Sequence, residues 1–113
     1  MLTKDALIAY GADYERGIKL CLGKEDFYFR MISKGLANEK FGDLGKHLEA
    51  NDIKAAFEDA HALKGITGNL ALTPLFMALE AMVEPLRQGK SIDYAPLYAT
   101  VMAEKQKLDA LLA

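Results

Sequence analysis

Apolar residues recur every three to four positions along most of this chain, which is the spacing of amphipathic helices. No convincing alternation of apolar and polar residues, as a half-buried strand requires, appears anywhere. Capping residues and glycines divide the pattern into segments. We therefore expect helices at residues 3–9, 14–22, 24–38, 41–50, 53–72, 74–88 and from 94 onward. Segment 41–50 is either a separate helix or a bent continuation of the helix before it.

The expected helix starts are short polar residues whose side chains can accept a hydrogen bond from the first turn. These N-caps are Thr3, Asp13, Asp52, Thr73 and Asp93. Pro85 is expected to kink the helix that contains it, because proline removes a backbone donor. Four long helices with short loops predict an all-α, up-down-up-down four-helix bundle with a short extra N-terminal helix. Its 113 residues are expected to form one domain, residues 1–113.

Apolar stripes within these helices define the expected core. In the segment 24–38 the stripe is Phe27, Met31 or Ile32, and Leu36. In 74–88 it is Leu75, Leu79, Met82 and Leu86, and in the last helix Leu97, Val101 with Tyr98, Leu108 and Leu111. In 53–72 it is Ile53, Ala56, Ala60, Leu63, Thr67, Leu70 and Ala71.

The helix at 53–72 departs from a purely structural pattern on the side away from its stripe. His61 points about 130° from the core direction, towards solvent. Gly65 and Gly68 follow it at one and two turns on the same side, and Lys64 lies on the flank with its stem reaching towards the imidazole. Each glycine costs a helix interior about 1 kcal/mol relative to alanine. The bare backbone therefore indicates that another molecule must approach this histidine closely.

Composition narrows the functions that are compatible with this pattern. The chain is 51% apolar and 27% charged, with a net charge of −2 and no basic block, which argues against nucleic-acid binding. No run approaches the length of a membrane span, and the N-terminus does not resemble a signal peptide, so we expect a cytoplasmic protein without membrane partners. Cys21 is the single cysteine and is expected to be a small buried hydrophobe.

The residues around His61 resemble the signature of histidine phosphotransfer (HPt) domains. The similarity lies in His61-Ala62-Leu63-Lys64-Gly65 followed by Gly68-Asn69-Leu70. Residues 13–18, Leu79-Glu80 and Arg87-Gln88-Gly89 also resemble segments of the family. The chain departs from many members at Ala71, where they carry glycine ten residues after the histidine.

This resemblance implies a phosphoryl carrier in multistep two-component signalling, without independent catalytic turnover. His61 would be phosphorylated by a receiver-domain aspartyl phosphate and would pass the group to another receiver aspartate. A neutral imidazole is a good nucleophile near pH 7, and Lys64 could neutralise phosphate charge. The chain lacks a nucleotide-binding loop and an acidic cluster for Mg²⁺, so no cofactor is expected and the receiver would supply the metal. The expected partners are receiver domains and a hybrid sensor kinase, and the expected state is a monomer.

Docking residues are less well defined. Gly65 and Gly68 would leave room for the partner. Phe57, one turn before His61, is either part of a docking patch or plain core packing. Asn69 could orient phosphate or be solvated, and Glu58 could support the second ring nitrogen of His61. Weaker docking candidates are Leu7, Ile8, Phe76 and Met77.

Other functions remain as alternatives. His47 lacks a lysine and a glycine at the corresponding positions and is expected to be a surface residue. Two histidines and one cysteine cannot form a structural zinc site, and Glu58 and His61 form a Glu-x-x-His pair without the second pair that a di-iron bundle needs. We therefore expect no metal site. An adaptor that docks receiver or kinase domains without being phosphorylated is the main alternative, followed by a hydrolase or metal enzyme.

Overall fold

The computed structural model describes residues 1–113 and contains helices and no strands. The seven helices are α1 (Lys4–Tyr10), α2 (Tyr14–Leu20), α3 (Glu25–Leu36), α4 (Lys40–Glu49), α5 (Ile53–Asn69), α6 (Thr73–Arg87) and α7 (Ala95–Leu112). The predicted all-α class is confirmed. No helix combines the length and the apolar character needed to cross a membrane.

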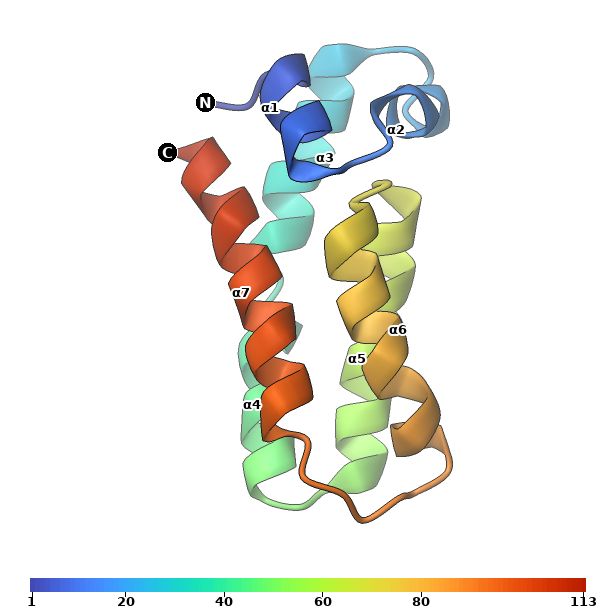
Figure 1. Ribbon diagram of the computed structural model, residues 1–113. Coiled ribbons are helices and arrows are strands. Elements are labelled where there is room, and N and C mark those ends of the chain that lie inside the picture. The colour runs from blue at the N-terminus through green and yellow to red at the C-terminus, as the bar shows by residue number, and fades with distance from the viewer.

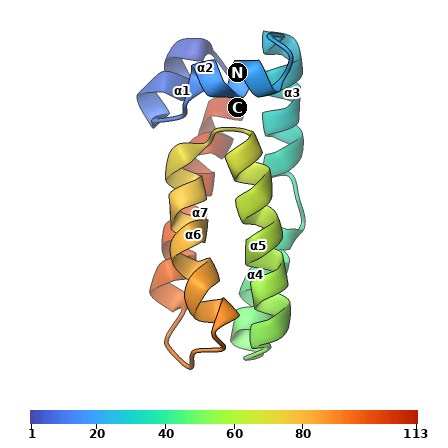
Figure 2. The same cartoon turned by 90° about the vertical axis from the view of Figure 1, so that its right-hand side faces the viewer.

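The chain forms a four-helix bundle in which α5, α6 and α7 are continuous helices and the remaining position is filled by α3 and α4, with a break between them (Figure 1). α3 and α4 follow each other along one side, and both contact α7. α5 packs between α4 and α6, and α6 packs on α7 (Figure 2). Two short helices, α1 and α2, cover the end of the bundle at which α5 gives way to α6. The bundle is as predicted, although two short helices rather than one lie at its N-terminal end.

The break between α3 and α4 makes residues 40–49 a separate helix, which resolves the alternative left by the sequence. It falls at residues 37–39, and the Asn38 side chain accepts a hydrogen bond from the Lys40 backbone N–H at 2.9 Å. Gly45 lies inside α4 and is needed for packing: a Cβ there would lie 2.6 Å from the hydroxyl oxygen of Tyr98. That hydroxyl donates to the Phe41 carbonyl oxygen at 2.8 Å.

The predicted caps are mostly correct. The side chains of Thr3, Asp13 and Asp52 each accept a hydrogen bond from a backbone N–H in the first turn, at 3.1–3.2 Å. Thr73 is not a cap, because α6 already includes it and Leu72 precedes the helix without a side-chain cap. Asp93 is not the N-cap of α7, because Tyr94 occupies that position, although the Asp93 side chain accepts a hydrogen bond from the Ala95 backbone N–H at 3.0 Å. α6 continues through Pro85 to Arg87.

The core contains most of the predicted stripes. On α5, the stripe from Ala56 to Ala71 is buried as predicted, and Ile53 is half-buried. The predicted α6 residues are all buried. On α3, Ile32 rather than its alternative Met31 is fully buried, and Leu36 is buried as predicted. The difference is at the start of the stripe, where Tyr28 is fully buried and Phe27 is half-buried. Cys21 is buried as expected.

Tyr28 fixes the contact between the N-terminal helices and the bundle. Its hydroxyl donates to the Leu70 carbonyl oxygen at 2.7 Å, where α5 has just ended. Burial raises the pKa of Tyr28 to about 12, so the phenol remains a donor over the physiological range. Gly17 in α2 leaves room for this ring, because a Cβ there would overlap the phenol.

Candidate functional site

His61 lies on the solvent side of α5, a helix whose opposite side forms part of the core. The ring is exposed, while Ala60 and Leu63 on either side of it in the sequence are fully buried. The helix is anchored by the Asp52 cap at its start and by the Tyr28–Leu70 hydrogen bond after its end. The histidine is thus accessible and is carried on a firmly packed element.

An aromatic neighbour orients the imidazole. The Phe57 ring stacks on His61 with centroids 5.5 Å apart and an interplanar angle of 16°. Phe57 is half-buried and also packs against the core, which confirms the core-packing interpretation of this residue. The guanidinium of Arg87 lies 5.2 Å from the Phe57 ring centroid, and its Nε lies 3.2 Å from a carboxylate oxygen of Glu84. One face of the site is therefore aromatic, with a cation beyond it.

Lys64 contacts α6. Its ammonium nitrogen lies 4.0 Å from a carboxylate oxygen of Glu80 and 5.9 Å from the centroid of the Phe76 ring. We expected the lysine stem to reach towards the imidazole, and the structure instead shows the ammonium held by the neighbouring helix. Lys64 and His61 are three residues apart on α5, so their side chains start from neighbouring positions of the helix surface.

The two glycines differ in their surroundings. A Cβ at Gly65 would meet no atom within 4 Å, so the backbone one turn after His61 is open. At Gly68 a Cβ would lie 3.1 Å from the Phe76 ring. Packing against α6 is therefore sufficient to explain Gly68, whereas nothing inside the chain explains Gly65.

Comparison with protein-family models gives a match to the Hpt domain over residues 34–113. The chain belongs to the Hpt domain family. Hpt domains carry phosphoryl groups on histidine in phosphorelays and interact with receiver domains of two-component systems. No match was found among curated proteins or among solved structures.

The Hpt match begins near the end of α3 and includes α4 to α7, so it contains every residue around His61 described above. The turn after α5 contains the residue at which the chain departs from the family pattern. Ala71 stands where many members have glycine, and it adopts φ 56°, a left-handed conformation that favours glycine. Its carbonyl oxygen accepts a hydrogen bond from the Asp13 backbone N–H at 2.9 Å, which connects this turn to the start of α2.

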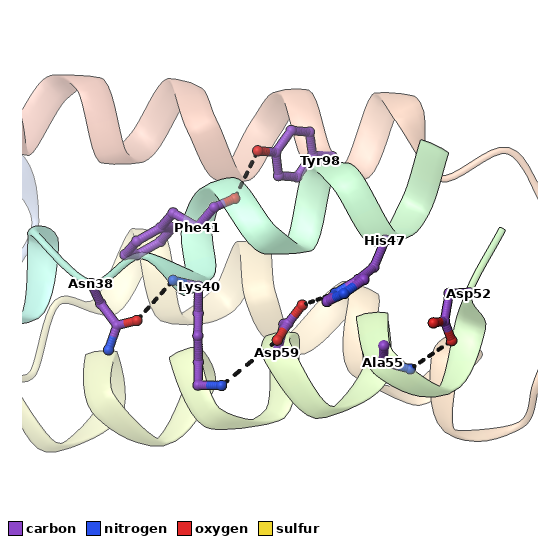
Figure 3. A network of polar contacts seen from close by, with 8 residues as sticks. All are labelled: Asn38, Lys40, Phe41, His47, Asp52, Ala55, Asp59 and Tyr98. Carbon is purple, nitrogen blue, oxygen red and sulfur yellow. Dashed lines mark hydrogen bonds and ion pairs between the residues drawn. The ribbon is translucent and has the colours of Figure 1, made fainter. Parts of the chain in front are cut away.

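A buried carboxylate on the far side of α5 was missed by the sequence analysis. Asp59 is 5% exposed, and its oxygens lie 2.5 Å from His47 Nδ1 and 3.7 Å from the Lys40 ammonium, both on α4 (Figure 3). The hydrogen bond to Asp59 raises the pKa of His47. The prediction that His47 is simply a surface residue is thus incomplete, because it is a partner of a buried acid. The sequence does indicate that Asp59 is buried, because it lies three residues after Ala56 and four before Leu63, at the helical spacing of the core stripe.

The remaining candidates for docking or phosphate contact differ in how exposed their side chains are. Asn69 is exposed and lines a groove between α5 and the helices α2 and α3. Met77 and Ile8 are exposed at 59% and 51%, whereas Leu7 is fully buried, so Leu7 cannot contact a partner. Glu58 is exposed. No group of three or more His, Cys, Asp or Glu side chains is placed to hold a metal ion.

Proposed function

We propose that His61 accepts a phosphoryl group from the aspartyl phosphate of one receiver domain and passes it to the aspartate of another. The observation that supports this most strongly is the combination of an exposed imidazole with open backbone at Gly65, on a helix that is otherwise packed. Substituting alanine at Gly65 would favour the helix, so retaining glycine there is explained by a partner that must come close.

The reaction needs one nucleophile from this chain. An unprotonated ring nitrogen of His61 attacks phosphorus, an N–P bond forms, and the P–O bond of the acyl phosphate breaks. The receiver aspartate leaves as a carboxylate, and the phosphoimidazolium loses a proton to solvent. In the reverse sense the phosphoimidazole takes a proton from solvent on its other ring nitrogen, a second receiver carboxylate attacks phosphorus, the P–N bond breaks and neutral imidazole leaves. Phosphoryl transfer depends mainly on positioning and charge neutralisation, which suits a site with so few polar groups.

Lys64 and the receiver together neutralise the negative charge of the phosphoryl group. Lys64 supplies a point charge for the phosphate oxygens once it moves from α6 towards His61. The receiver supplies Mg²⁺, and a hybrid sensor kinase is the source of the first phosphorylated receiver. Phe57 stacks on the imidazole and limits its orientations, while Phe57, Gly65, Gly68 and Asn69 line the contact with the receiver.

The experiment is incubation of the protein with receiver domains of the same organism that carry labelled phosphate. We expect acid-labile label on this chain, no label in His61→Gln, and slower labelling in Lys64→Ala with an unchanged circular dichroism spectrum. His47→Gln is the matched control, since His47 is the other histidine and faces Asp59. If His61→Gln is labelled normally, the phosphoryl group lies on another residue and the proposal for His61 fails. If His61→Gln signals normally without label, the carrier proposal fails and the adaptor function takes its place.

A further inference from the structure

The contacts of Lys64 point to a residue that controls its availability. Lys64 is 29% exposed and Glu80 is 56% exposed, and their charged groups are 4.0 Å apart across the α5–α6 interface. The Phe76 ring lies beside the same ammonium at 5.9 Å, and the missing side chain of Gly68 lets Phe76 pack there. The lysine is therefore held by α6 on two sides before any phosphate arrives.

Glu80 is the acidic residue that faces Lys64. Glu84, one turn further along α6, pairs with Arg87 at 3.2 Å instead. Glu58 is exposed on α5. Lys64 and Arg87 are thus each paired with a different carboxylate of α6.

Resting on the proposed function, we infer that Glu80 is a positioning residue that competes with phosphohistidine for Lys64. A phosphoryl group carries between one and two negative charges near neutral pH, so it draws the ammonium away from a single carboxylate. Glu80 opposes this movement by attraction for Lys64 and by repulsion of the phosphate. It keeps the phosphorylated state from becoming too stable to pass its group onward.

The magnitude follows from the exposure of the pair. An ion pair of this kind changes an equilibrium by about two- to five-fold. Glu80→Gln should therefore shift the transfer equilibrium with a phosphorylated receiver towards this chain by that factor. By the same factor it should lower the ionisation pKa of the phosphoryl group on His61 by about 0.3–0.7, since a freed ammonium favours the dianion.

The experiment uses the whole chain phosphorylated with potassium phosphoramidate and a pH titration of the phosphohistidine followed by ³¹P NMR. The variants are Glu80→Gln, the matched control Glu84→Gln, Lys64→Ala, and Lys64→Ala combined with Glu80→Gln. We expect the shift in Glu80→Gln, a smaller one in Glu84→Gln, and loss of most of the Glu80 effect in the Lys64→Ala background. A structural role for Glu80 alone would not move a phosphoryl pKa in this Lys64-dependent way.

The outcomes separate the two proposals. If phosphohistidine forms on His61 but Glu80→Gln shifts the titration no more than Glu84→Gln, the inference about Glu80 is overturned while the carrier function stands. The same holds if the shift persists undiminished without Lys64. If no phosphohistidine forms on His61, the carrier function and the inference about Glu80 fail together.

Discussion

Gly65 offers the clearest separation of stability from function in this molecule. A Cβ at this position meets no atom within 4 Å, and the residue lies in the interior of α5. Gly65→Ala should therefore gain the full difference in helix propensity, about 1 kcal/mol. For a chain of this length that corresponds to a rise of about 4 °C in Tm, measurable by calorimetry or by urea unfolding.

A larger side chain at the same position should slow transfer without destabilising the fold. Gly65→Gln projects a flexible side chain into the space one turn beyond His61, where the receiver must approach. We expect normal or increased stability together with loss of at least ten-fold in the rate of transfer from a phosphorylated receiver. Labelling by phosphoramidate, a donor too small to be obstructed, should remain close to that of the unmodified chain.

Gly42 provides the matched control, because a Cβ there also meets no atom within 4 Å and the residue lies in α4 away from His61. Gly42→Ala and Gly42→Gln should stabilise the fold to a similar extent and leave transfer unchanged. The reasoning is refuted if Gly65→Ala destabilises the protein, or if Gly65→Gln accepts phosphate from a receiver as fast as Gly42→Gln does.

Three further substitutions test the fold. Gly17→Ala should destabilise by about 1–3 kcal/mol in urea unfolding, because its methyl group would displace the buried Tyr28 ring; an unchanged midpoint would contradict this packing. Leu22 is 79% exposed and has a φ of 60°, a left-handed conformation that strains a residue with a Cβ. Leu22→Gly should therefore stabilise the fold by about 1 kcal/mol, and a loss of stability would show that this strain is absent. Asp59 raises the pKa of His47 in the folded protein above the value of about 6.5 that histidine has in the unfolded chain. The pair therefore stabilises the fold fully below a pH of about 6.5, and this stabilisation is lost as pH rises through the folded-state pKa of His47. Urea unfolding between pH 6 and 9 should show that decline in the unmodified chain and not in His47→Gln, and equal slopes would disprove the coupling.

The central helix was well predicted because its pattern is local. The stripe from Ala56 to Ala71 and the outward direction of His61 follow from the helical period alone, and both agree with the structure. Caps at Thr3, Asp13 and Asp52 were found for the same reason, since a cap involves residues only three positions apart.

What the sequence analysis missed depends on contacts between distant segments. Gly17 and Tyr28 belong to different helices, and the burial of Tyr28 involves a hydrogen bond to Leu70, which is 42 residues away in the sequence. The period of α5 places Asp59 in the core, but only the fold brings His47 to it. Such pairings are set by tertiary packing, which a single sequence does not display.

The contacts at the site show the same limit. The spacing after His61 treats Gly65 and Gly68 alike, and the structure separates them because Phe76 packs against one and not the other. The direction of Lys64 towards Glu80 likewise depends on how α6 lies along α5.

The most direct test of the account is to map the phosphoryl group itself. The protein would be incubated with a phosphorylated receiver of the same organism, digested at neutral to mildly alkaline pH, and sequenced by tandem mass spectrometry. We predict phosphate on the peptide that contains His61, attached to its imidazole. Phosphate on His47, on another residue, or on no residue of a chain that still supports signalling would contradict the account.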